Sequence, residues 1–393
     1  MKEVANAASF LFVLIYKPQN STFMNYLNLL LMMLIPVIYS SSDSQENIKL
    51  VAGCNTQTGE NGINVYDFNS HDGSLKKISV SNAGPNPSFF CFSGKSNLIY
   101  AANEVNTFKG KAGGGITTIK YNNDYTKISK VNEIPVPNGS PCYISISPEN
   151  DFLFVANYTG GSIAVFKLDK DGIPQTLCDS ISFRGKAGKV SHAHMISFDP
   201  AGKHIYLADL GLDRIMIYSF DKVTGKLIPL NDNGVSLPEG TGPRHFVFNK
   251  DGSKMYVMGE LKSTVTVFNV KDNGDLVLLQ TISALSENYK GQNSSAEILI
   301  GNSGEFLYGS NRGENSIVTF RIGKDGLLTS AGRIGCGGDW PRNFTIDPSG
   351  KFLLVGNQKS GNISILATDS KSGLPSSAIH QVNLNSPMCL KFH

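Results

Sequence analysis

The stretch PRHFVFNKDGSKMYVMGELKSTVTVFNV (residues 243–270) contains three short apolar runs that are rich in β-branched and aromatic residues. An Asn-Lys-Asp-Gly segment separates the first run from the second, and the residues GELKS separate the second from the third. Gly, Asn and Asp favour tight turns, so the pattern predicts three antiparallel strands joined by hairpins. Another Asp/Gly turn and the run LVLLQ (276–280) predict a fourth strand.

The same unit recurs along the chain. Its opening run is matched at seven places: PSFFCFS from Pro87, PCYISIS from Pro141, AHMISFD from Ala193, PRHFVFN from Pro243, AEILIGN from Ala296, PRNFTID from Pro341 and PMCLKF from Pro387. Neighbouring starts are 45 to 54 residues apart. Four strands per unit, repeated about seven times, are typical of a β-propeller. We therefore predict an all-β, seven-bladed β-propeller with four antiparallel strands per blade.

The two ends of the repeat complete each other. After Ser44 the runs IKLVAG, INVYDF and SLKKISV resemble strands two to four of a unit, and the final PMCLKFH resembles strand one alone. Joining them closes the N-terminal blade with the C-terminal strand and removes two exposed sheet edges. Tandem β-sandwiches, the alternative all-β arrangement, would not predict this split unit. Residues 45–393 should thus form one propeller domain.

The N-terminal segment is expected to lie outside the fold. Residues 27–39, LNLLLMMLIPVIY, are too few for the ~20 residues of a membrane span but match the apolar core of a secretory signal. No Lys or Arg lies between Met24 and Leu27, so an uncleaved anchor remains the alternative. We expect 1–44 to be a signal peptide or upstream extension with a linker. The protein would then be secreted or periplasmic, and cytoplasmic if this segment is not a working signal.

Composition and motifs exclude several function classes. Lys and Arg number 35 against 32 Asp and Glu, a net charge of +3, which lacks the basic excess of a nucleic-acid-binding protein. The six cysteines form no C-x-x-C pair and several lie in apolar runs, so free buried thiols are expected, although disulfides remain possible. No Walker loop, dinucleotide-binding motif or nucleophile elbow occurs. We expect a monomer with a small-molecule substrate, without cofactor, metal, nucleic-acid partner or membrane span in the mature chain.

The repeat also predicts which side chains meet. One residue after each opening Pro or Ala, at one end of the innermost strand, are Ser88, Cys142, His194, Arg244, Glu297, Arg342 and Met388. Strand two returns to the same face and ends at Asn103-Glu104, Asn157-Tyr158, Asp209-Leu210, Gly259-Glu260, Asn311-Arg312 and Asn357-Gln358. Both sets should converge on one mouth of the central channel.

The charged members of these sets predict a site. Turn formation explains Asn103, Asn157 and Asn357, because Asn side chains bond to neighbouring backbone. It does not explain His194, Arg244, Glu260, Arg312 and Arg342. Three guanidinium groups at one mouth repel unless they meet carboxylates or an anion, and Glu260 and Glu297 would neutralise only part of the charge. We predict a site for a small anionic or carbonyl-rich ligand, with a salt-bridged plug of the channel as the alternative.

Further residues at this mouth are candidates for substrate binding. Besides Arg342, they are Glu104, Asp209, Gln358 and the single tryptophan, Trp340. Trp340 directly precedes Pro341 and would stack on a sugar-like ring or pack a loop. His71, His192, His204 and His245 lack a partner set in the sequence, so surface or core roles are expected for them.

Four segments carry a resemblance to a known family. SHAHMISFDPAGKHIYLADLGLDRIMIY (191–218), GPRHFVFNKDGSKMYVMGELKSTVTVF (242–268), SNRGENSIVTF (310–320) and WPRNFTIDPSGKFLLVGNQKSGNISI (340–365) resemble the seven-bladed lactonase family. This family includes propeller-type 6-phosphogluconolactonases and fungal 3-carboxy-cis,cis-muconate lactonizing enzymes. The resemblance covers residues 48–393 and implies opening of a lactone ring, or its reverse, without a metal. Matching the muconate enzymes' motifs residue by residue implies a catalytic set of His194, Arg244, Glu260 and Arg312.

The resemblance also implies roles for these residues. The arginines would hold the acidic group of the substrate and stabilise the developing oxyanion. His194 or Glu260 would activate water, and the sequence does not say which. Export would favour an unphosphorylated sugar lactone over the 6-phosphogluconolactone of the family name. Two alternatives remain: a muconate-type cycloisomerase, or a non-catalytic binding propeller, since FVANYTGGSIAVF (154–166) also resembles YVTN-type surface repeats.

Overall fold

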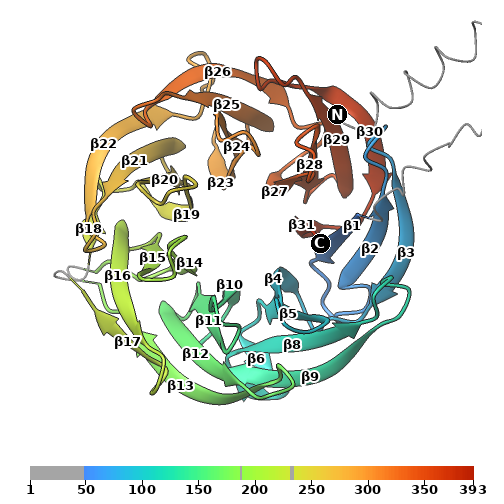
Figure 1. Ribbon diagram of the computed structural model, residues 1–393, viewed down its shortest axis with the longest axis vertical. Coiled ribbons are helices and arrows are strands. Elements are labelled where there is room, and N and C mark those ends of the chain that lie inside the picture. Colours follow the sequence, from blue (N-terminus) through green and yellow to red (C-terminus); the bar gives the residue numbers. More distant parts are fainter. Residues whose placement is uncertain (1–47, 186–187, 231–233) are drawn as a thin grey trace, which may run out of the picture. The chain divides into compact units, whose positions relative to one another are not determined.

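The computed structural model describes residues 48–185, 188–230 and 234–393. Seven β-sheets surround a central channel, so the seven-bladed propeller is confirmed (Figure 1). All regular elements within the described residues are strands, and no helix there is long and apolar enough to cross a membrane. The segment expected to be a signal peptide or extension, 1–44, lies outside the described residues.

The blades are numbered along the chain. Blade 1 contains β1 (Lys49–Cys54), β2 (Ile63–Phe68), β3 (Leu75–Ser81) and the C-terminal β31 (Pro387–Phe392). Blade 2 contains β4 (Pro87–Phe92), β5 (Leu98–Asn103), β8 (Gly114–Tyr121) and β9 (Ile128–Val136), with a hairpin of β6 (Thr107–Phe108) and β7 (Lys111–Ala112) between β5 and β8. Blade 3 contains β10 (Pro141–Ile146), β11 (Phe152–Asn157), β12 (Ser162–Leu168) and β13 (Pro174–Ser182). Blade 4 contains β14 (Ala193–Phe198), β15 (Ile205–Asp209), β16 (Arg214–Asp221) and β17 (Lys226–Pro229), and the short β18 (Val235–Ser236) also pairs with β16.

The last three blades follow the same plan. Blade 5 contains β19 (Pro243–Phe248), β20 (Lys254–Gly259), β21 (Thr264–Val270) and β22 (Leu276–Ser283). Blade 6 contains β23 (Ser294–Ile300), β24 (Phe306–Arg312), β25 (Ser316–Ile322) and β26 (Leu328–Gly335). Blade 7 contains β27 (Pro341–Ile346), β28 (Phe352–Asn357), β29 (Asn362–Thr368) and β30 (Pro375–Asn383). In every blade strand one lies nearest the channel and strand four lies at the rim (Figure 1).

The first blade is closed by the last strand, as predicted. Strand β31 runs antiparallel to β1, with Leu50 opposite Phe392 and Ala52 opposite Leu390. Blade 1 therefore has the same arrangement as the other blades, with strand one (β31) nearest the channel, then β1 and β2, and strand four (β3) at the rim. This closure removes the edge that an unpaired β1 would present.

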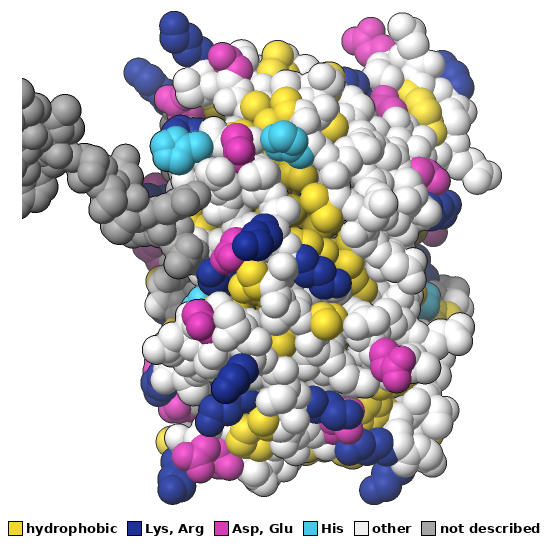
Figure 2. Space-filling model, turned by 90° about the vertical axis from the view of Figure 1, so that its right-hand side faces the viewer, with side chains coloured by type: hydrophobic (Ala, Val, Ile, Leu, Met, Phe, Trp, Pro, Cys, Tyr) yellow, Lys and Arg dark blue, Asp and Glu magenta, His cyan; other side chains and the backbone are white. Residues whose placement is uncertain are grey.

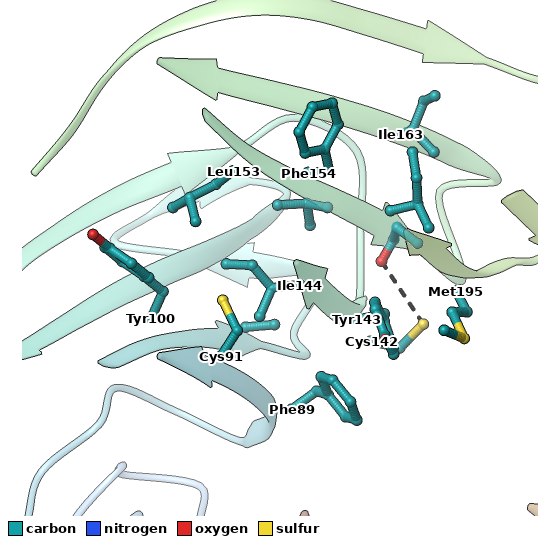
Figure 3. Packing of buried hydrophobic residues seen from close by; sticks show 14 of the residues in the cluster. Phe89, Cys91, Tyr100, Cys142, Tyr143, Ile144, Leu153, Phe154, Ile163 and Met195 are labelled. Carbon is teal, nitrogen blue, oxygen red and sulfur yellow. Dashed lines mark hydrogen bonds between the residues drawn. The ribbon is translucent and has the colours of Figure 1, made fainter. Parts of the chain in front are cut away.

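Apolar packing and a repeated tyrosine bond hold neighbouring blades together. Figure 3 shows Phe89, Tyr143 and Met195 from three successive blades, packed around buried side chains of β10 and β11. Strand-two tyrosines donate their hydroxyl to a glycine carbonyl in the outer hairpin of the next blade: Tyr100 to Gly172 (2.7 Å), and Tyr206, Tyr256 and Tyr308 to Gly274, Gly326 and Gly373 (each 2.9 Å). Each of these glycines has a positive φ, between 71° and 88°, which a residue with a side chain adopts at a cost.

All six cysteines lie in the described residues and none forms a disulfide. Five are buried and Cys178 is half-buried. The expectation of free buried thiols is thus confirmed, and the disulfides left open by the sequence are absent.

Candidate active site

A tight turn at the start of strand one builds one mouth of the channel. The residue before the opening position has a positive φ in five blades: Asn86, Ser140, Gly242, Trp340 and Ser386. Its carbonyl accepts the N–H of the residue that follows strand two, as from Glu260 to Gly242 (2.8 Å) and from Gln358 to Trp340 (2.9 Å). This turn brings the end of strand two beside the start of strand one. The two sets of side chains predicted from the repeat do therefore meet.

A β-bulge follows each turn. In blade 3 the ladder passes from Pro141 opposite Asn157 to Tyr143 opposite Ala156, so Cys142 has no partner residue. His194 and Arg342 occupy the same position in their blades, and in blade 5 both Arg244 and His245 are skipped. A bulge re-aims the side chain of the extra residue, which is a common device next to active sites.

The expected position of Glu297 is wrong by one residue. In blade 6 Ser295, not Ala296, lies opposite Asn311, and β23 begins at Ser294. Ala296 is thus the equivalent of Arg244, and Glu297 lies one residue further into the channel. The opening proline that marks the register in five other blades is missing here, and successive residues of a strand face opposite sides. Within the described residues Glu297 therefore forms no ion pair with the mouth arginines, although its charge still acts on Arg244.

Glu260 bridges two of the predicted arginines. Its Oε1 lies 2.9 Å from Arg312 Nη2, and its Oε2 lies 3.0 Å from Arg244 Nε without the alignment of a hydrogen bond. Ser294 Oγ also donates to Oε1 at 2.8 Å. Burial on its own would raise the pKa of Glu260, but the positive charges of Arg312 and Arg244 outweigh it and hold the pKa below its usual value. Glu260 is consequently an ionised group that orients both arginines.

Backbone and hydroxyl oxygens hold the other side of each guanidinium group. Arg244 Nη1 donates to the Ala296 carbonyl at 2.9 Å. Arg312 donates from Nε to the Ser294 carbonyl (2.9 Å) and from Nη2 to Ser294 Oγ (2.8 Å). Within the described part of the chain, Arg244 Nη2 and Arg312 Nη1 donate no hydrogen bond. Each arginine is therefore fixed in orientation and keeps one NH₂ group for a ligand.

His194 is a buried neutral imidazole beside these arginines. Its side chain is 4% exposed, and its ring packs edge-on against Tyr158 and His245, with centroids 5.7 Å and 5.1 Å away. Burial, together with the positive charge of Arg244, lowers the pKa of His194 well below its usual value. Nδ1 has no hydrogen-bond partner among the described residues. At neutral pH this imidazole is therefore uncharged, and one of its two ring nitrogens is able to accept a proton.

The residues predicted for substrate binding differ in the contacts that they make at the mouth. Arg342 Nη2 lies 3.4 Å from Glu104 Oε2 and reaches across blade 1, which separates their two blades. Trp340 packs near two cations, with its ring centroid 3.3 Å from Lys359 Nζ and 5.5 Å from Arg312 Cζ. Gln358 is half-buried beside it, at the end of β28. Trp340 therefore lies near Arg312 of the Arg244–Glu260–Arg312 network, and the charge of Arg342 acts on Arg244.

Asp209 is not brought into this group. It is fully buried, and its carboxylate accepts bonds from the backbone of His192 and Leu212 (both 3.0 Å) and from Ser191 Oγ. Asp209 therefore stabilises the mouth turn, as Asn157 does by donating to the Pro137 carbonyl (3.2 Å). Asn103 and Asn357 likewise bond to turn carbonyls.

Sequence reasoning missed a second polar layer, made by His245, Glu297 and Asn343. Each comes one residue after the mouth position of its blade. Comparing the repeats at this next position as well would have revealed them in the sequence. These residues also line a channel cavity of about 370 Å³ that extends away from the mouth. Within residues 48–185, 188–230 and 234–393, no three His, Cys, Asp or Glu side chains cluster closely enough to hold a metal.

Comparison with known proteins places the chain in a family. A family model described as "Lactonase, 7-bladed beta-propeller" matches residues 49–392. The chain belongs to this lactonase family. It is 26% identical over 346 residues to 6-phosphogluconolactonase of Bacillus subtilis, covering 86% of this chain and 97% of the relative. It is 34% identical over 323 residues to 6-phosphogluconolactonase of Formosa agariphila, covering 79% and 90%.

A solved structure of a similar protein matches nearly the whole propeller. The periplasmic gluconolactonase PpgL of Pseudomonas aeruginosa superposes with a TM-score of 0.82 at 29% identity, covering 88% of this chain and 98% of that one. The predictions of family and of enzyme class, a lactonase, are confirmed.

Proposed function

We propose that this lactonase hydrolyses a sugar-type lactone to its hydroxy acid, without a metal, at the channel mouth formed by His194, Arg244, Glu260 and Arg312. The observation that carries the proposal is the pair of oriented guanidinium groups, each with an uncommitted NH₂, beside a neutral histidine. Such donors, fixed before the substrate arrives, stabilise charge that develops during acyl transfer.

The geometry supports a division of labour. The lactone carbonyl oxygen would accept bonds from Arg244 Nη2 and Arg312 Nη1. His194 would take a proton from water as the water oxygen bonds to the carbonyl carbon, and the arginines would stabilise the resulting oxyanion. When the ring C–O bond breaks, the histidinium would return the proton to the leaving alkoxide, giving the hydroxy acid and a neutral imidazole.

We assign the base to His194 rather than to Glu260. The pKa of each group is lowered, so the assignment rests on the contacts that each group makes. Both oxygens of the Glu260 carboxylate face arginines, whereas His194 Nδ1 has no hydrogen-bond partner among the described residues. The role of Glu260 would be to hold both guanidinium groups in place. Among the described residues, the one ion pair of Arg342 is its 3.4 Å contact with Glu104, which leaves donors to bind a peripheral oxygen or anionic group of the substrate, with Gln358 and Trp340 nearby.

We propose export and an unphosphorylated substrate as well. The apolar run 27–39 has the length of a secretory signal core, and the similar structure from Pseudomonas aeruginosa is described as periplasmic. Sequencing the N-terminus of the protein isolated from its own cells should give a start between about Ser40 and Asn47. An intact Met1 on a cytosolic protein would contradict export and remove the argument against a phosphorylated lactone.

The competing interpretation is a non-catalytic propeller whose channel is sealed by salt bridges. The saturated carboxylate of Glu260 favours it, because a plug needs the same ion pairs. Purified protein should be tested on δ-gluconolactone, its 6-phosphate and a carboxymuconolactone, each corrected for spontaneous hydrolysis. We expect catalysed hydrolysis of a sugar lactone. Turnover of the muconolactone alone would indicate a cycloisomerase, and inactivity on every lactone would favour the plug.

A further inference from the structure

The layer of side chains directly below the mouth is polar on one side only. In the blades 2, 3 and 4 this layer consists of Phe89, Tyr143 and Met195, which are apolar or aromatic (Figure 3). In blades 5, 6 and 7 it consists of His245, Glu297 and Asn343. All three are buried. The polar side of the layer lies in the blades that carry Arg244, Arg312 and Arg342.

A single carboxylate links this polar side. Glu297 Oε1 accepts from His245 Nδ1 at 2.9 Å and from the backbone N–H of Ile298 at 3.0 Å. Glu297 Oε2 accepts from Asn343 Nδ2, and Asn343 Oδ1 accepts from the backbone N–H of Leu390 at 2.7 Å. The bonds of Glu297 therefore reach blades 5 and 7, and through Asn343 also blade 1.

Glu297 binds two side chains, and each of them belongs to the residue that comes immediately after a mouth arginine in the sequence. His245 follows Arg244 and Asn343 follows Arg342, and both pairs lie where the β-ladder is interrupted. In blade 5 both Arg244 and His245 lack a partner residue in the ladder, whereas in blade 7 Arg342 lacks one and Asn343 lies opposite Gly356. Side-chain bonds therefore help to set the position of the backbone at these bulges. The residue before Glu297 also contributes, since the Ala296 carbonyl accepts from Arg244 Nη1.

A buried carboxylate is a costly way to fill a channel. Such a charge needs partners to offset its lost hydration, and apolar side chains fill the same layer in the other half of the ring. Burial would raise the pKa of Glu297, but His245, Arg244 and the Ile298 N–H outweigh it and the pKa is lowered. Burial also lowers the pKa of His245 to about 4, so a neutral imidazole donates to an ionised carboxylate.

We propose that Glu297 is a positioning residue, which sets the spacing of Arg244 and Arg342 by holding His245 and Asn343 beneath the mouth. It does not touch the substrate. Its effect on turnover rests on the proposed function, whereas its effect on the arginine positions does not.

Exchanging the carboxylate of Glu297 and the amide of Asn343 tests whether Glu297 positions the arginines. Glu297→Gln places an amide NH₂ against Asn343 Nδ2, and Asn343→Asp places a second carboxylate against Glu297. The double variant restores one donor and one acceptor at this contact, and either oxygen of an Asp at 343 still accepts from the Leu390 N–H. Asp179→Asn is the matched control, because Asp179 also links two blades, by accepting from the Leu227 N–H (2.9 Å) at the outer rim.

Two readouts are needed. The first is steady-state kinetics on the best lactone, and the second is the Nε–H NMR signals of Arg244 and Arg342, assigned with Arg244→Lys and Arg342→Lys. We expect each single exchange to raise KM about 10- to 100-fold and to shift both signals, and the double variant to return both toward the wild type. The control should change neither.

Unchanged KM and arginine signals in folded single variants would overturn the proposal, as would a double variant as impaired as the worse single one. If a single variant does not fold, the double variant decides alone: wild-type signals support the proposal and displaced signals refute it. If the wild-type protein opens no lactone, the proposed function fails, and the NMR signals still decide whether Glu297 positions the arginines.

Discussion

The neutral state of His194 has a direct consequence for the pH dependence of the reaction. Its pKa is lowered in the folded protein, so the imidazole stays unprotonated well below pH 6.5, where an ordinary histidine begins to lose its lone pair. We expect kcat/KM to stay level from pH 8 to about pH 5.5. An unperturbed histidine base would lose about tenfold at that pH. The measurement is kcat/KM against pH after correction for spontaneous hydrolysis, and a decline centred near pH 6.5 would contradict this role.

Arg342 should matter for binding more than for chemistry. Its only ion pair in the described structure is the 3.4 Å contact with Glu104, and it lies outside the four residues matched to the muconate enzymes. Arg342→Ala should raise KM about tenfold with a smaller change in kcat, because the interaction lost is made equally with substrate and transition state. Arg321→Ala, which removes a cation from the Phe306 ring elsewhere on the propeller, is the control. An equal fall in kcat and kcat/KM in Arg342→Ala would place Arg342 in the transition state instead.

Strand β31 contributes far more to stability than its length suggests. It pairs with β1 along the channel, and Met388, Cys389 and Leu390 are buried. Deleting residues 387–393 should expose β1 as an edge and lower the free energy of unfolding by several kcal/mol, out of the roughly 5–15 kcal/mol of a typical domain. Denaturant unfolding measures this, with Lys391→Ala as a control that leaves the strand pairing intact. A truncated chain as stable as the wild type would mean that β31 does not close the blade.

The order of the strands could be predicted from the sequence because it repeats. An opening proline marks the register in five of the seven units, so Arg244 and Arg342 were assigned to the right end of the right strand. His194 was also assigned correctly, although its unit opens with Ala193 instead of a proline. Blade 6 lacks this proline and opens with Ser294 and Ser295, so Glu297 was misplaced by one residue. A shift of one residue changes the face of a side chain, and only the pairing with Asn311 reveals it.

Side-chain partners could not be predicted in the same way. The repeat places both Glu260 and Asp209 at the end of strand two. In the structure Glu260 bridges two arginines, whereas the carboxylate of Asp209 accepts hydrogen bonds from the backbone of its own turn. Trp340 was a candidate for stacking on a ligand, but Lys359 and Arg312 already lie near its ring. These outcomes depend on rotamers and on competing partners across blades, which a repeat pattern does not contain.

Charges are balanced on the face of the propeller shown in Figure 2 but not at the channel mouth. On the face shown in Figure 2, acidic and basic side chains are interspersed and no patch of one sign covers it. At the mouth, by contrast, the ion pairs that Arg244, Arg312 and Arg342 form within the described residues are with Glu260 and Glu104, which is three positive charges against two negative ones. A small anionic or carbonyl-rich substrate is the ligand that such a mouth would attract.

We propose that this protein opens its lactone at the channel mouth lined by arginines. The most direct measurement is the initial rate of lactone hydrolysis by wild-type protein, Arg244→Ala and Glu260→Gln, with thermal unfolding of each recorded in parallel. We predict that Arg244→Ala loses about 10²- to 10³-fold in kcat while it remains folded, because one oxyanion donor is gone. Glu260→Gln should lose a similar factor, because both guanidinium groups lose their fixed partner. Wild-type turnover in both variants, with only their stability lowered, would show that the network is a plug and that the reaction occurs elsewhere.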